Sequence, residues 1–140
     1  MPRADFYLID KPRFRDNPLL LVCELARRAH DQQIPTLIHA RDRDQAEALD
    51  ALLWDFDPDA FVPHQLAGDD DDDLTPVLIV PPELDLPLRA LVINLRDSTV
   101  AGQPEAVKEV VAADPAERTG SRTRWTEYKA RGFELRKFDM

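Results

Sequence analysis

Two short runs of the chain, Val77–Val80 and Leu91–Leu95, show no alternation between polar and apolar residues. A strand with one face in solvent alternates with a period of two, whereas a strand covered on both faces is apolar almost throughout. Sheets covered on both faces are mostly parallel, and parallel neighbours need crossover connections, which are usually helices. The two runs therefore predict an open α/β fold with a mainly parallel sheet and helices on both faces.

The segments around these runs supply further strands and the crossover helices. Short β-type runs predict strands at residues 5–9, 36–40, 107–112 and 133–136. Helix start signals occur three times, each as a cap residue with a favourable neighbour: Asn17 with Pro18, Asp42 with Gln45, and Asp114 with Pro115. Gly132 is a natural end for the last helix. We expect one α/β domain that spans residues 1–140.

Residues 54–75 carry turn-forming and acidic residues, and we expect an ordered loop there. Aromatic side chains gather in its first part, including Trp54 and Phe61. Large apolar side chains in a loop either fold back onto the core or form a docking patch, and the sequence leaves both alternatives open. The second part contains the run Asp69–Asp73, whose mutual repulsion prevents burial, so we expect an acidic surface loop at about residues 68–75.

The length of 140 residues suffices for one hydrophobic core, and the apolar content of 44% is close to the globular average. No apolar run approaches the roughly 20 residues that span a bilayer, and the N-terminal residues lack the pattern of a secretory signal. We therefore expect a cytoplasmic protein without membrane contact. The single cysteine, Cys23, lies in an apolar stretch and is expected to be a buried packing residue.

Patterns that would support an enzyme are missing from the sequence. No glycine-rich loop follows a strand to bind the phosphates of a nucleotide, because the four glycines are scattered: Gly68, Gly102, Gly120 and Gly132. The three histidines lie far apart without ligand-like spacing, and no serine or cysteine occurs in a nucleophile motif. We expect no catalytic residues, no metal site and no cofactor.

Positive charge is concentrated at the C-terminal end of a chain whose formal net charge is −9. Residues 118–140 contain seven Lys or Arg and only three Asp or Glu. Within the expected last helix, Arg118, Arg122, Trp125 and Lys129 are spaced so that they share one face. Such a basic face beside an aromatic side chain suits an acidic peptide with an apolar end, and the alternative is a solvated basic face with Trp125 packed inward.

Four sequence strings, in the order in which they occur, resemble the chi subunit of the bacterial DNA polymerase III holoenzyme. They are Asp5–Ile9, Leu49–Trp54, the specific string Phe61–Gly68 (FVPHQLAG) and Arg124–Phe133. The resemblance extends over nearly the whole chain. It implies a Rossmann-like fold without bound nucleotide, and a non-catalytic adaptor of the clamp loader in DNA replication.

The resemblance also implies partners and the residues that contact them. Family members bind the psi subunit on one side and, on the other, the acidic C-terminal tail of the single-stranded-DNA-binding protein. By position, the residues that the resemblance assigns to tail binding are Arg118, Arg122, Arg124, Trp125, Tyr128 and Lys129. The resemblance assigns a second set of residues to the binding of psi, or of a helicase that competes for the same surface. They are Trp54, Phe61, Val62 and Pro63.

Two further hypotheses concern the charged segments. A module that binds nucleic acid directly would use the same basic helix, but we expect no such contact because the acidic remainder of the chain repels phosphate. The run Asp69–Asp73 is unusual for the family, and together with Leu74 it imitates an acidic tail with an apolar end. It is a candidate competitor for the basic helix, within or between molecules.

Overall fold

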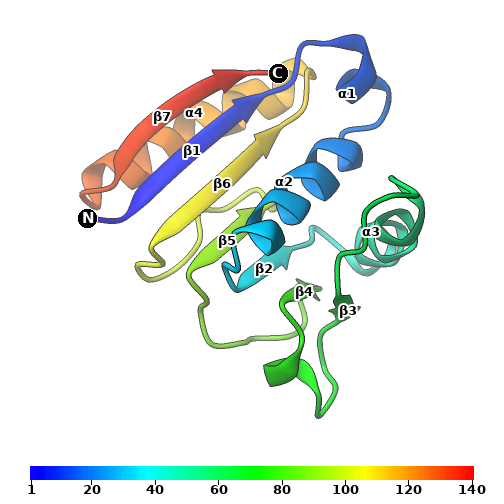
Figure 1. Ribbon diagram of the computed structural model, residues 1–140. Helices are drawn as coiled ribbons and strands as arrows, with labels where there is room; N and C mark the ends of the chain where they lie inside the picture. The colour runs from blue at the N-terminus through cyan, green and yellow to red at the C-terminus, as the bar shows by residue number, and fades with distance from the viewer.

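The computed structural model describes all 140 residues, and its strands form one seven-stranded sheet (Figure 1). The strands are β1 (Arg3–Leu8), β2 (Thr36–His39), β3 (His64–Leu66), β4 (Val77–Val80), β5 (Leu91–Asn94), β6 (Ala106–Val111) and β7 (Glu134–Asp139). Their order in the sheet is β3-β4-β2-β5-β6-β1-β7, and every neighbouring pair is parallel. The prediction of a parallel, Rossmann-like α/β fold is confirmed.

Helices cover both faces of this sheet. The helices are α1 (Pro12–Asp16), α2 (Leu19–Asp31), α3 (Arg43–Asp55) and α4 (Pro115–Ala130), with a short 3-10 turn, η1, at Asp72–Leu74. Figure 1 shows α2 and α3 on the near face and α4 on the far face, behind β7, β1 and β6. This arrangement leaves α4 at one edge of the sheet, close to both chain termini.

The two faces of the sheet bury two separate hydrophobic clusters. Successive side chains of a strand point to opposite faces, so Tyr7 of β1 packs in the cluster under α2 and α3 while Phe6 packs in the cluster under α4. In the central strands β4 and β5 every residue is buried, which explains their continuous apolar sequence. Burial of each large aliphatic side chain stabilises the fold by roughly 1.5–3 kcal/mol.

Side-chain caps open two of the three long helices as predicted. Asp42 accepts a hydrogen bond from the backbone N–H of Gln45 at 2.7 Å, and Asp114 accepts one from the backbone N–H of Ala116 at 2.7 Å. The prediction for the first long helix is wrong in detail, because Asn17 makes no side-chain cap and Pro18 takes the cap position. The φ of −58° at Pro18 is already helical, so the ring starts the turn without help from Asn17.

Three elements differ from the sequence-based expectation. A short helix, α1, precedes the first long helix at a place where the sequence predicted no helix, and it buries Phe14. A short strand, β3, lies within the expected loop and pairs with β4 from His64 to Leu66. The last strand continues beyond Arg136 to Asp139, because it pairs with β1 along its whole length. Local propensity is weak in all three, and tertiary pairing or packing decides them.

No helix of the structure combines the length and the apolar character needed to cross a bilayer.

The buried position of Cys23 leads to a testable expectation. Its side chain is completely buried on α2, and desolvation together with the nearby charge of Glu24 raises the pKa of the thiol to about 12. Since the thiolate is the reactive form, Cys23 should not react with a thiol reagent in the folded protein at pH 8 but should react on denaturation. Absorbance after addition of Ellman's reagent, with and without urea, measures this, and rapid reaction of the folded protein would contradict the burial.

Candidate functional site

A buried carboxylate on β6 connects the sheet to α4. Glu109 is fully buried, and its Oε1 accepts a hydrogen bond from Nε of Arg124 at 2.8 Å. Its Oε2 accepts hydrogen bonds from the hydroxyl of Tyr128 and from the side-chain amide of Asn94, both at 2.7 Å. Burial raises the pKa of Glu109, while the charge of Arg124 and the donors of Asn94 and Tyr128 oppose that rise. Because Arg124 and Tyr128 belong to α4, these contacts fix how the helix lies on the sheet.

Two further features complete this buried network. Desolvation and the charge of Glu109 raise the pKa of Tyr128, so its hydroxyl keeps its proton, and the same oxygen accepts from the backbone N–H of Val100 at 2.9 Å. A Cβ atom at Gly120 would lie 3.3 Å from Nη1 of Arg124. A glycine inside a helix costs about 1 kcal/mol relative to alanine, and here it leaves space for the buried guanidinium.

A groove of about 490 Å³ lies between α4 and the edge of the sheet. The strand side consists of Phe6 and Leu8 of β1 and Lys137 of β7, and the helix side consists of Arg118, Ser121, Arg122, Trp125 and Thr126. Trp125 is half-buried, and its ring packs edge-on against that of Phe6 with a centroid distance of 5.1 Å. The indole therefore belongs both to the core and to the wall of the groove.

Three cations surround the groove without a carboxylate partner. Arg118, Arg122 and Lys137 form no ion pair in the structure. Arg118 is held in place by a hydrogen bond from Nη2 to the carbonyl oxygen of Ile9 at 2.6 Å, whereas Arg122 and Lys137 are exposed. Guanidinium groups can donate two parallel hydrogen bonds to one carboxylate. The groove is thus suited to an acidic ligand with an apolar side chain.

The structure divides the six residues that we expected to bind an acidic tail. Three line the groove together: Arg118, Arg122 and Trp125. Lys129 is exposed further along α4 and does not line the groove. Arg124 and Tyr128 are only 4% and 0% exposed, and both face the sheet in the Glu109 network. They position the helix rather than face the solvent.

Lys137 is a groove residue that the sequence reasoning missed. The expected last strand ended at Arg136, one residue before it. In the parallel register of β1 and β7, Lys137 pairs with Phe6, and both residues line the groove. Leu135, two residues earlier on β7, packs against the cluster under α4, so the alternation of side chains along a strand places Lys137 on that same face.

A second exposed surface lies where α3 ends. Trp54 and Phe61 are 58% and 66% exposed, and their ring centroids are 5.9 Å apart. Val62 is buried in the core and Pro63 is half-buried. Folding back onto the core is therefore confirmed for Val62, whereas the aromatic pair faces solvent, and its role as a docking patch stays a prediction.

The acidic run lies far from the basic helix within the molecule. Asp69–Asp73 connects β3 to β4 at one edge of the sheet, whereas α4 packs on β6 and β7 towards the other edge (Figure 1). The hypothesis that this run competes for the basic helix of the same molecule is therefore wrong.

The structure also shows no group of three His, Cys, Asp or Glu side chains that could hold a metal ion.

A parallel α/β domain with a basic groove and an exposed aromatic pair, and without a glycine-rich phosphate loop, has the surfaces of a protein-binding module. The family model described as DNA polymerase III chi subunit, HolC, matches residues 1–136, and the chain belongs to this family. It therefore has an accessory, non-catalytic role in DNA replication.

Relatives from three bacteria support this assignment, and each is named DNA polymerase III subunit chi. The Pseudomonas aeruginosa protein is 34% identical, covering 96% of this chain and 94% of its own length. The Escherichia coli K12 protein is 35% identical, covering 96% of both chains. The Haemophilus influenzae protein is 30% identical, covering 82% of both chains.

A solved structure shares the fold at low sequence identity. It is a chain in the complex of a S. cerevisiae Dbp5 variant with Nup159, a Gle1 variant, IP6 and ADP. The TM-score is 0.67 at 16% identity, and the match covers 99% of this chain but only 42% of that chain. This likeness concerns the fold alone.

The Glu109 network should be essential for stability. Glu109→Ala leaves the charge of Arg124 buried without a partner, so the free energy of unfolding should fall by about 3–5 kcal/mol in urea titrations followed by circular dichroism. Replacing both partners, Glu109→Leu with Arg124→Met, should cost less than the single change. Arg43→Ala, which removes an exposed ion pair with Glu83, is the control and should leave the urea midpoint nearly unchanged. A small effect of Glu109→Ala would contradict the role of the network.

Proposed function

We propose that the chain is an adaptor that binds the acidic C-terminal tail of the single-stranded-DNA-binding protein in the α4 groove. The observation that carries the proposal is the set of three unpaired cations, Arg118, Arg122 and Lys137, beside the half-buried ring of Trp125. In this proposal the tail's carboxylates contact the cations, and its apolar end contacts the indole and Leu8. As part of the clamp loader in the bacterial cytoplasm, the adaptor would link the loader to coated single-stranded DNA.

The positions of the three cations favour different contributions to binding. Arg118 is already oriented by the carbonyl of Ile9, so it loses little side-chain entropy when it meets a carboxylate. Arg122 and Lys137 are exposed and stand on opposite walls, one on α4 and one on β7. A carboxylate between them would be attracted from both sides. Exposed charges steer association and are screened by salt, so the affinity should depend on ionic strength.

The exposed aromatic pair supports a second contact. Trp54 lies in the last turn of α3 and Phe61 in the segment between α3 and β3. Figure 1 shows α3 on the opposite side of the molecule from α4, and β3 is the edge strand opposite β7. We infer that this patch binds the psi subunit, or a helicase that competes for it, with Val62 and Pro63 holding the loop in position. Large aromatic side chains are enriched among the anchors of protein interfaces. Two separated surfaces would allow both partners to bind at once.

Removal of one groove cation should weaken tail binding. Arg122→Ala should raise the Kd of a synthetic acidic tail peptide about tenfold or more, and the difference should shrink as salt is added. Fluorescence anisotropy of a labelled peptide measures this. Arg28→Ala, an exposed arginine on α2 outside the groove, is the matched control and should leave the Kd unchanged. An unchanged Kd for Arg122→Ala, or tight binding of a single-stranded oligonucleotide in place of the peptide, would contradict the proposal.

Loss of an aromatic anchor should affect only the second partner. Phe61→Ala should weaken binding of purified psi by about tenfold or more, because it removes a large apolar contact from the interface. The side chain is 66% exposed, so the fold should be retained. Isothermal titration calorimetry with psi and with the acidic peptide separates the two surfaces: psi binding falls and peptide binding does not. Equal binding of psi by Phe61→Ala and the unaltered chain would show that the patch is not the contact.

A further inference from the structure

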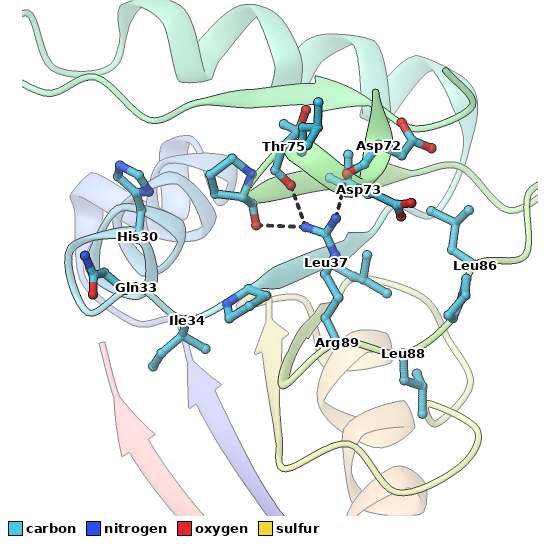
Figure 2. A pocket seen from close by; sticks show the side chains of 15 residues that line it. His30, Gln33, Ile34, Leu37, Asp72, Asp73, Thr75, Leu86, Leu88 and Arg89 are labelled. Atoms are coloured by element: carbon cyan, nitrogen blue, oxygen red, sulfur yellow. Dashed lines mark hydrogen bonds between the residues drawn. The ribbon is translucent and has the colours of Figure 1, made fainter. Parts of the chain in front are cut away.

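A groove of about 650 Å³ lies at the amino ends of β2, β4 and β5, and no residue of α4 lines it (Figure 2). Its walls come from the end of α2, from the turn that contains η1, and from the segment before β5. Figure 2 shows Ile34 on one side and Leu86 and Leu88 on the other, with Arg89 between them. The apolar lining also includes Leu37 and Leu78, so the groove is a mainly apolar surface open to solvent.

Two leucines at this groove remain exposed in the folded chain. Leu74 on η1 is 82% exposed, and Leu88 is 43% exposed. Single exposed leucines are common, but here both adjoin one hollow that is lined by further apolar side chains. A contiguous apolar surface with a polar rim is typical of a docking site.

The acidic turn beside the groove has a fixed conformation. Arg89 donates from Nη1 to the carbonyl oxygens of Thr75 at 2.7 Å and Pro76 at 2.9 Å, and from Nη2 to that of Asp72 at 2.8 Å (Figure 2). The carboxylate of Asp72 accepts hydrogen bonds from the backbone N–H of Gly68 and from the side chain of Gln65. The turn is therefore held in one shape, and Leu74 is presented beside the groove rather than carried on a mobile tip.

The acidic run Asp69–Asp73 adjoins the groove, with Asp72 and Asp73 in its lining, and is called the aspartate rim here. Most of its carboxylates have no partner within the chain. Four of its five aspartates form no hydrogen bond through the carboxylate and no ion pair: Asp69, Asp70, Asp71 and Asp73. Arg89, which also lines the groove, directs its donors to carbonyl oxygens, and its charge acts on Asp72 and Asp73 without an ion pair. Such a rim repels the phosphates of nucleic acids and of anionic lipids, and it attracts lysine and arginine side chains.

We propose that this groove docks a basic segment of another protein, in which large apolar side chains contact Leu74, Leu88 and Ile34 while Lys or Arg side chains face the aspartate rim. The apolar hollow supplies the contact area and the rim supplies orientation and fast association. The surface is separate from the α4 groove and from the Trp54–Phe61 patch, so its occupant would be an additional partner.

A designed peptide tests the two components of this recognition. The probe is a short fluorescent peptide in which lysines and leucines alternate, with versions in which serine replaces leucine or glutamate replaces lysine. Leu74→Ser should raise the Kd of the lysine–leucine peptide about tenfold, as should the replacement of the four unpaired aspartates by asparagine. Backbone amide shifts in nuclear magnetic resonance spectra should be confined to residues around Ile34, Leu74 and Leu88.

A matched control distinguishes the effect of the groove on binding from the effect of the chain's overall negative charge. Four exposed carboxylates elsewhere are neutralised in the control: Asp10→Asn, Asp16→Asn, Glu47→Gln and Asp139→Asn. This variant should bind the peptide within about twofold of the unaltered chain, since its groove is intact. An equal loss in the control, an unchanged Kd for Leu74→Ser, or tight binding of the serine version would overturn the proposal. So would self-association in sedimentation experiments that Leu74→Ser abolishes, because a second copy would then be the occupant.

Discussion

The buried carboxylate of Glu109 determines the position of α4, and the groove beside α4 depends on that position. One carboxylate oxygen accepts a hydrogen bond from Arg124, and the other accepts hydrogen bonds from Tyr128 and Asn94. A single side chain of the sheet is therefore bonded to two side chains of α4. A hydrophobic contact alone allows a helix to slide or rotate, whereas directed hydrogen bonds between buried groups allow few arrangements. With α4 held in this way, Arg118, Arg122 and Trp125 face the hollow above β1 and β7.

The parallel sheet separates the surfaces of the molecule. Its strand order places β7 and α4 at one edge and β3, with the end of α3, at the other. The basic groove therefore lies on one side of the chain, and the exposed pair Trp54 and Phe61 lies on the other. Such a division would suit the proposed adaptor, because two partners could bind without competing for the same residues. The concentration of positive charge in the C-terminal segment fits this division, since that segment supplies all three cations of the groove.

Much of the fold could be predicted from the sequence, because its strands and helices carry strong local signals. The apolar runs Val77–Val80 and Leu91–Leu95 and the caps Asp42 and Asp114 correspond directly to observed elements. The short elements α1 and β3 could not be predicted, since pairing with β4 and burial of Phe14 decide them and neither contact is local. For the acidic turn the sequence predicts only solvation, but Arg89, distant from it in sequence, fixes its shape.

The candidate site was only partly predictable for a similar reason. Helical spacing placed Arg118, Arg122 and Trp125 on one face, and the structure brings these three together. The family resemblance added Arg124 to the site by position, whereas in the structure its side chain is buried against Glu109. Arg122 and Arg124 are two residues apart on α4, so they point to different sides of the helix, and Arg124 faces the carboxylate on β6. A groove residue from the last strand, Lys137, required knowledge of the sheet register.

A crystal structure of the chain with a bound acidic tail peptide would test the account most directly. The account predicts that the peptide's carboxylates contact Arg122 and Arg118 in the groove beside Trp125, while Arg124 remains paired with Glu109. A peptide bound on another surface, or an Arg124 side chain that has left the core to contact the peptide, would contradict it.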